Sequence, residues 1–179
     1  MKNKGFTLIE LLVVISIIVI LTGIVFAGYR TGQQQLALQR AANKLAQDIR
    51  RTGGMALAAE KIPGGEIPPG GYGIYFGAVN DTYYKLYGDT SPDPPNEKYN
   101  SGDQEIETIN MEQGIKISQL ISQLIPTSSL SINFKPPDPA IMLAGDSGIG
   151  EVTITICLIS DTSKTKTVTV NKAGLIEID

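Results

Sequence analysis

The segment Gly5-Phe6-Thr7-Leu8-Ile9-Glu10 opens an apolar run that continues to Ala27, and Glu10 is the only charged residue within this run. As a helix that rises about 1.5 Å per residue, residues 6–27 are long enough to cross the roughly 30 Å hydrocarbon layer of a bilayer. A carboxylate near the centre of a bilayer costs roughly 2.5 to 3.5 kcal/mol, so Glu10 requires a partner or a function. The run therefore predicts a membrane helix that carries one functional acid.

The residues before the apolar run predict its orientation. Lys2 and Lys4 precede Gly5 with no acid between them. Positively charged flanks stay in the cytoplasm, so we expect everything after Ala27 to lie outside it. The sequence predicts a single pass with the C-terminal domain outside the cytoplasm.

The amino terminus resembles that of type IV pilins and pseudopilins. The resemblance is carried by the short basic leader, the Gly5-Phe6 junction, Thr7-Leu8-Ile9-Glu10 and the unbroken apolar helix. In that family a membrane enzyme, the prepilin peptidase, cuts after the glycine on the cytoplasmic side, and the new amino-terminal residue is N-methylated. The resemblance implies cleavage of a leader at residues 1–5, methylation of Phe6, and residence in the bacterial inner membrane until assembly.

The resemblance also assigns an assembly role to Glu10. In the family, a glutamate at this place pairs with the amino-terminal amine of a neighbouring subunit inside a helical filament. Cleavage would place the cationic amine of Phe6 one helical turn from Glu10, on the same helix face. A buried charge is tolerated when an opposite charge meets it. The partners implied are the prepilin peptidase, other pilin or pseudopilin subunits, and inner-membrane lipid.

Two other interpretations of the apolar run remain. Val25-Phe26-Ala27 resembles the small-residue pattern of an ordinary secretory cleavage site, which would release a secreted binding domain. Secretory apolar regions span about 7 to 15 uncharged residues, whereas this run is longer and contains Glu10. A plain membrane anchor explains the length of the run but gives no reason for Glu10 to follow Gly5-Phe6.

Residues 28–62 predict an amphipathic continuation of the transmembrane half of the helix at residues 6–27. Small and apolar side chains recur at steps of three and four residues, which predicts one stripe: Leu38, Ala42, Leu45, Ile49, Thr52, Ala56 and Ala59. We expect this stripe to pack on the chain's own sheet. Gly53-Gly54 weakens the helix by about 1 kcal/mol per glycine, and Pro63 ends it after Glu60.

Residues 63–179 predict a β-rich domain. Strands are expected at residues 72–76, 83–87, 129–134, 151–159, 165–170 and 175–178, the first two as a hairpin and the last three as an antiparallel meander. The strand at 129–134 is expected to be half-buried. Residues 115–125 contain Ile-Ser-Gln-Leu twice and favour a short helix or an irregular edge. The fold class is therefore α+β, with a long amino-terminal helix packed on an antiparallel sheet.

Acidic residues are concentrated in residues 81–112, where the only bases are Lys85 and Lys98. One interpretation is a calcium site, because this ion takes several carboxylate and carbonyl oxygens and some pseudopilins bind it. No calcium-loop spacing supports such a site, so a solvated acidic face is favoured. Residues 88–103 within this segment predict a long exposed loop rich in Pro, Asp and Asn.

The composition argues against catalysis. The chain has no His and a single Cys, Cys157, so the usual general base near neutral pH and the usual zinc ligand sets are absent. The sequence holds no nucleophile elbow, phosphate-binding glycine loop or paired-carboxylate cleft. Cys157 alternates with apolar residues in a predicted strand, which favours a semi-buried packing role. We expect no enzyme, no metal and no cofactor, and the chain is the substrate in its own cleavage.

A nucleic acid partner is not favoured by the charge. The formal charge of −3 falls to −5 when cleavage removes Lys2 and Lys4. The one local basic cluster is Lys164, Lys166 and Lys172, on which a DNA-capturing minor pilin of an uptake machine would depend.

The globular part resembles one branch of the family. Gly-Tyr-Gly-Ile-Tyr-Phe at residues 71–76 and the closing Gly-Leu-Ile at residues 174–176 look like the minor pseudopilins grouped as general secretion pathway protein H and type IV fimbrial biogenesis protein T. The resemblance implies a minor pilin or pseudopilin of a type IV pilus or a type II secretion pseudopilus. It leaves the machine, the position in the filament and any small-molecule ligand open.

Overall fold

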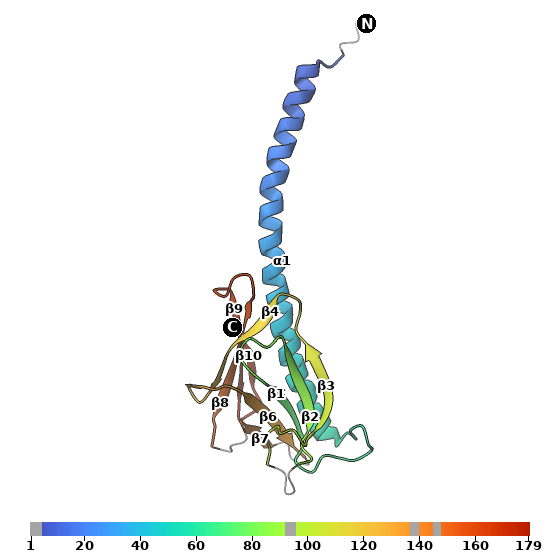
Figure 1. The fold of residues 1–179 in the computed structure, drawn as a ribbon, viewed down its shortest axis with the longest axis vertical. Helices are drawn as coiled ribbons and strands as arrows, with labels where there is room; N and C mark the ends of the chain where they lie inside the picture. Colours follow the sequence, from blue (N-terminus) through green and yellow to red (C-terminus); the bar gives the residue numbers. More distant parts are fainter. Residues whose placement is uncertain (1–4, 92–95, 137–139, 145–147) are drawn as a thin grey trace. The chain divides into compact units, whose positions relative to one another are not determined.

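The computed structural model describes residues 5–91, 96–136, 140–144 and 148–179. The chain divides into two compact units, Met1–Leu36 and Ala37–Asp179. One helix, α1 (Leu8–Ala58), contributes residues to both units. Figure 1 shows α1 and the strands that follow it.

The first unit is dominated by the apolar part of α1. The large side chains of Leu8–Val25 are exposed, and this stretch is long and apolar enough to cross a membrane. The two hydroxyls within this stretch are satisfied by the helix itself, because Ser16 Oγ donates to Leu12 O and Thr22 Oγ1 donates to Ile18 O. No polar side chain in this stretch except Glu10 therefore requires a partner outside the helix.

The part of α1 in the second unit packs on the sheets as predicted. Six members of the expected stripe are buried: Leu38, Ala42, Leu45, Ile49, Thr52 and Ala56. Ala59 is the exception. It lies beyond the end of the helix, is exposed, and has a left-handed backbone with φ of 46°. Hydrogen bonds from Glu60 N to Met55 O and from Ala59 N to Ala56 O close the helix end in a Schellman motif.

Two five-stranded antiparallel sheets make up the rest of the second unit. The first has the order β3-β2-β1-β6-β7, and the second has the order β10-β9-β8-β4-β5. The strands of the first sheet are β1 (Tyr72–Phe76), β2 (Tyr83–Gly88), β3 (Gln104–Asn110), β6 (Leu130–Lys135) and β7 (Ala140–Leu143). Those of the second are β4 (Ile115–Ser122), β5 (Ile125–Pro126), β8 (Glu151–Leu158), β9 (Thr165–Asn171) and β10 (Ile176–Ile178).

The predicted hairpin and meander are both present. β1 pairs with β2, and Asn80 takes a left-handed conformation in the connection between them. β8, β9 and β10 pair in succession. Val152, Ile154, Ile156 and Leu158 all enter the core from β8, which confirms the alternation predicted from the sequence.

The prediction for residues 115–125 was wrong. Most of this segment is the regular strand β4, which pairs with β8 in the interior of the second sheet. The register shifts between Ile117 and Gln119, and Ser118 Oγ donates to Thr155 O at this irregularity. The shift lets Ile117 and Leu120 both enter the core although three positions separate them. A bulge had therefore concealed the alternation that marks a strand.

β6 is buried on both faces, although one half-buried face had been expected. Leu130, Ile132 and Phe134 enter the core, and Ser131 and Asn133 on the other face are also buried. Residues of the segment after β2 cover this second face, since Tyr99 N donates to Ser131 Oγ. The sequence prediction also missed β3 and β7.

The apolar core is a single cluster that joins α1 to both sheets. One polar contact is built into this packing, because the Tyr84 hydroxyl of β2 donates to Asp48 Oδ2 of α1 over 2.6 Å. Asp48 lies outside the predicted stripe and is nevertheless half-buried. Cys157 is fully buried, deeper than the semi-buried position expected from the strand alternation.

Replacing Gly54 by Ala is expected to stabilise the second unit. A Cβ at Gly54 would meet nothing within 4 Å, and alanine favours a helix interior by about 1 kcal/mol over glycine. We expect the midpoint of thermal unfolding, followed by circular dichroism, to rise by about 2 to 4 °C. Gly53→Ala is the matched control, because its Cβ would press on the Phe134 ring at 3.3 Å and offset the gain. An equal rise in both variants would contradict this packing.

Candidate processing and assembly site

The Gly5–Phe6 bond lies in an exposed segment that precedes α1. Gly5, Phe6 and Thr7 have no regular secondary structure, and the Phe6 side chain is 88% exposed. A Cβ placed on Gly5 would meet nothing within 4 Å. The peptide bond at the predicted cleavage site is therefore outside the helix, and no described side chain covers it.

Thr7 and Glu10 form a capping box at the start of α1. The Thr7 N–H donates to Glu10 Oε2 over 2.9 Å, and the Glu10 N–H donates to Thr7 Oγ1 over 3.3 Å. The Thr7 hydroxyl also donates to Glu10 Oε2 over 2.9 Å. Two backbone donors that a helix start leaves unpaired are thus satisfied by side chains. The acid also lies in the first turn, where the helix dipole favours negative charge.

The sequence prediction had given Glu10 a partner only in a neighbouring chain. The Thr-x-x-Glu spacing of Thr7-Leu8-Ile9-Glu10 is the signature of a capping box, so this second contact could have been found. Both hydrogen bonds that the Glu10 carboxylate accepts from the described residues go to Oε2. The other oxygen, Oε1, accepts none from those residues and can take a further donor without disturbing the cap.

The segment between β2 and β3 is anchored by two carboxylates. Asp103 accepts backbone N–H groups from Thr90, Ser91 and Asn100 over 2.8 to 3.1 Å. Asp89 is fully buried, and its Oδ2 accepts the Glu97 N–H over 2.7 Å. Hydrogen bonds to these two carboxylates therefore hold the described part of the predicted loop at both of its ends.

Aromatic packing holds the same segment against the first sheet. The ring of Tyr99 stacks on Tyr75 with centroids 4.2 Å apart and meets the edge of Tyr87 at 5.2 Å. This packing and the carboxylate anchors explain why Ser131 and Asn133 on the outer face of β6 are buried.

The solvated acidic face expected at residues 81–112 is only partly present. Four of its acids form ion pairs with bases: Glu97 with Lys135, Glu105 with Lys85, Glu107 with Arg51, and Glu112 with Arg40. Asp89 is buried, which contradicts a fully solvated face. Within the part of the chain that the structure describes, no three Asp, Glu or Cys side chains are grouped so that they could hold a metal ion.

Asp89 is the acid whose ionisation the fold perturbs most clearly. Burial, with smaller contributions from nearby Asp103 and Glu97, raises the pKa of Asp89 from 3.8 to about 6, although the Glu97 N–H acts in the opposite direction. Its Oδ1 has no partner among the described residues. The folded chain therefore binds a proton here more tightly than the unfolded chain does.

The raised pKa of Asp89 predicts a stability that falls with rising pH. The contribution is fully present below about pH 3.8 and is lost as the pH passes through about 6. Asp89→Asn keeps an acceptor for the Glu97 N–H without the charge. Between pH 5 and 7.5, we expect the midpoint of thermal unfolding of the unmodified chain to fall by about 2 to 4 °C more than that of the variant.

Asp161→Asn is the control for this measurement. Asp161 is exposed, and hydrogen bonds from Ser163 lower its pKa, so it stays ionised throughout this range. This variant is expected to keep the pH dependence of the unmodified chain. A pH dependence in Asp89→Asn equal to that of the unmodified chain would contradict the assignment.

The basic residues of the DNA-capture alternative are not brought together. Lys164 precedes β9 and Lys172 follows its far end. At about 3.3 Å per strand residue, the two lie on the order of 26 Å apart along the strand. Lys166 stands near Lys164, so the predicted three-residue cluster is divided between the two ends of β9.

Comparison with known proteins identifies the amino terminus. Residues 1–26 match the family model described as the prokaryotic N-terminal methylation motif. No curated protein sequence matches the chain. Two crystal forms of the type IV minor pilin FimU from Pseudomonas aeruginosa (strain PAO1) are similar in structure, each at 14% identity. The matches cover 79% of this chain and 87% or 92% of FimU, with TM-scores of 0.42 and 0.43.

At this level of structural similarity the assignment depends on the motif. The match at residues 1–26 includes Gly5, Phe6 and Glu10, and it confirms the predicted prepilin-type amino terminus. The helix and antiparallel sheets confirm the predicted α+β fold class. The chain thus carries a prepilin-type amino-terminal methylation motif at the start of an α+β fold.

Proposed function

We propose that this chain is a structural subunit, a minor pilin or pseudopilin, of a type IV pilus or a type II secretion pseudopilus. The observation that carries the proposal is the methylation motif at residues 1–26, which places an exposed Gly5–Phe6 bond directly before an apolar helix. The prepilin peptidase removes residues 1–5, and Phe6 becomes the methylated amino terminus. The chain acts here as a substrate and a building block.

The location follows from the same segment. Residues 6–27 hold the chain in the bacterial inner membrane, and residues 28–62 connect this span to the extracytoplasmic domain at residues 63–179. α1 passes Ala27 without a break, so cleavage after Ala27 would remove the first part of a continuous helix. The sequence of events is membrane insertion, cleavage, methylation and entry into a filament.

Glu10 sets the register of the subunit in the filament. Its Oε2 caps the helix through Thr7, whereas Oε1 accepts no hydrogen bond from the described residues of its own chain. The cationic amine of a neighbouring subunit's Phe6 can bind Oε1 while the cap persists. A carboxylate that meets an opposite charge in this way no longer opposes burial among apolar helices.

The test is the recovery of the chain from filaments. A carboxyl-terminally tagged chain is expressed in a pilus-forming host with and without its prepilin peptidase, and surface filaments are sheared off. We expect the tag in the sheared fraction only when the peptidase is present, and in the membrane fraction otherwise. Recovery from the membrane fraction alone in both hosts would overturn the proposal of a filament subunit.

A further inference from the structure

The hairpin between β4 and β5 has an unusual tip. Ser122 pairs with Ile125, and the two residues between them, Gln123 and Leu124, have φ of 49° and 68°. A two-residue turn with both central residues left-handed normally contains Asn-Gly or a similar pair. Left-handed conformations cost roughly 1 to 2 kcal/mol for residues with a Cβ. The fold thus carries strain at this tip.

The strained tip displays apolar side chains to solvent. Leu124 is 86% exposed and Ile125 is 66% exposed. Packing within the chain therefore does not offset the conformational cost of a leucine in a left-handed turn. Strain of this kind is commonly retained where a segment has a function.

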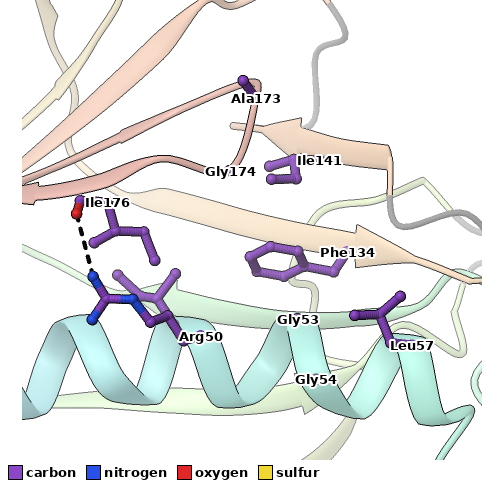
Figure 2. A pocket seen from close by; sticks show the side chains of 10 residues that line it. Arg50, Gly53, Gly54, Leu57, Phe134, Ile141, Ala173, Gly174 and Ile176 are labelled. Carbon is purple, nitrogen blue, oxygen red and sulfur yellow. Dashed lines mark hydrogen bonds between the residues drawn. The ribbon is translucent and has the colours of Figure 1, made fainter.

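An apolar groove lies elsewhere in the second unit. Its floor is formed by the face of α1 between Ile49 and Leu57, where Gly53 and Gly54 leave the helix backbone uncovered, and by Phe134 of β6. Its walls are Ile141 of β7 and the turn from Ala173 to Ile176 (Figure 2). The volume is about 350 Å³, which is within the range of small-ligand pockets.

The tip and the groove lie at opposite edges of the second sheet. The strand order β10-β9-β8-β4-β5 places the groove beside β10 and the tip at β5. The two cannot meet within one chain. A contact between the tip of one copy and the groove of the next joins two different surfaces, and such a contact repeats from head to tail.

An exposed acid lies beside the tip, and an exposed base lies at the rim of the groove. The Gln123 N–H donates to Glu151 O over 3.2 Å, which places the exposed Glu151 next to the tip. At the groove, the exposed Arg50 donates to Ile176 O over 3.3 Å and is held at the rim (Figure 2). An aliphatic tip with an acid beside it complements an apolar groove with a base at its edge.

We propose that the Leu124–Ile125 tip of one copy docks into the Arg50–Phe134 groove of a second copy of this chain. The proposal goes beyond the proposed function, because the contact uses neither Phe6 nor Glu10. It forms between the extracytoplasmic domains of unprocessed chains as well. The contact therefore exists before filament assembly and can be tested without it.

The experiment is disulfide cross-linking between two differently tagged full-length chains in membranes of a host that lacks the prepilin peptidase. One chain carries Ile125→Cys and the other carries Leu57→Cys, and the native Cys157 is buried. We expect a mixed disulfide dimer under mild oxidation. Ile159→Cys replaces Ile125→Cys in the control, because Ile159 is also exposed and apolar but lies just beyond the far end of β8.

A second substitution separates docking from folding. Leu124→Asn, added to the Ile125→Cys chain, suits a left-handed turn and removes the apolar side chain, so thermal stability is expected to hold or rise. We expect the yield of the mixed dimer to fall at least about fivefold. Arg50→Glu in the groove chain should lower the yield as well, and Glu151→Arg in the tip chain should restore it. Equal yields with Ile125→Cys and Ile159→Cys, or a yield unaffected by Leu124→Asn, would overturn the proposal.

Discussion

A chain with Glu10→Leu is expected to insert into the membrane normally and yet to be absent from filaments. Leucine lengthens the apolar run, so insertion is at least as favourable as in the unmodified chain. The substitution removes the carboxylate that we expect to meet the amine of a neighbouring subunit. The tagged variant should be found in the membrane fraction, and its signal in sheared filaments should fall to background. Full recovery in filaments would contradict the pairing role.

Two matched variants separate the charge of Glu10 from its contact with Thr7. Glu10→Gln retains a capping box, since glutamine also serves at this position, but it lacks the charge. Thr7→Val removes the hydroxyl that bonds to Glu10 and keeps the charge. If the charge carries assembly, Glu10→Gln fails as Glu10→Leu does and Thr7→Val assembles. If instead Glu10→Gln assembles and Thr7→Val fails, the filament requires the capped start of the helix and not the charge.

Gly73→Ala is expected to destabilise the second unit strongly. Gly73 of β1 lies opposite Tyr87 of β2, and a Cβ at Gly73 would lie 2.5 Å from Tyr87 Oη and closer still to two ring carbons. Tyr87 is fully buried, so its ring cannot turn out into solvent without leaving the core. Overpacking of this kind lowers the free energy of unfolding by about 3 kcal/mol. We expect the midpoint of thermal unfolding to fall by about 6 to 12 °C.

A second substitution, at Tyr87, should relieve this clash. Gly73→Ala combined with Tyr87→Leu removes the ring that the new methyl group would meet, so the double variant should lose less than the sum of the two single losses. Purely additive losses would show that Tyr87 is not the obstacle. A midpoint unchanged by Gly73→Ala would contradict the packing of β1 against β2.

The long helix and the last three strands could be predicted because their signals are local. Each of these signals depends on neighbouring residues alone. The signals are the charge-poor run after Gly5-Phe6, the stripe from Leu38 to Ala56 at helical spacing, and the strict alternation of Val152, Ile154 and Ile156. The capping of Glu10 by Thr7 was equally local. The cost of a charge in lipid indicates that Glu10 needs a partner, but it does not distinguish Thr7 of the same chain from the amine of another chain.

The rest depends on contacts between distant segments. The alternation of buried residues along β4 is interrupted at the bulge near Ser118. This bulge is defined by the pairing of β4 with β8 and cannot be seen in the sequence of β4 alone. β6 is buried on both faces because Tyr99 and its neighbours cover Ser131, and the burial of Asp89 follows from the same cover. The end of the helix was also not predicted correctly from the residue spacing. The left-handed Ala59 ended the helix two residues before the predicted end at Glu60.

The account depends most on where the mature chain begins. The chain is purified from a host that has its prepilin peptidase, and the amino-terminal peptide is sequenced by mass spectrometry. We predict that the peptide starts at Phe6 and carries one additional methyl group on its amine. A mature chain that starts at Met1, or after Ala27, would contradict the account.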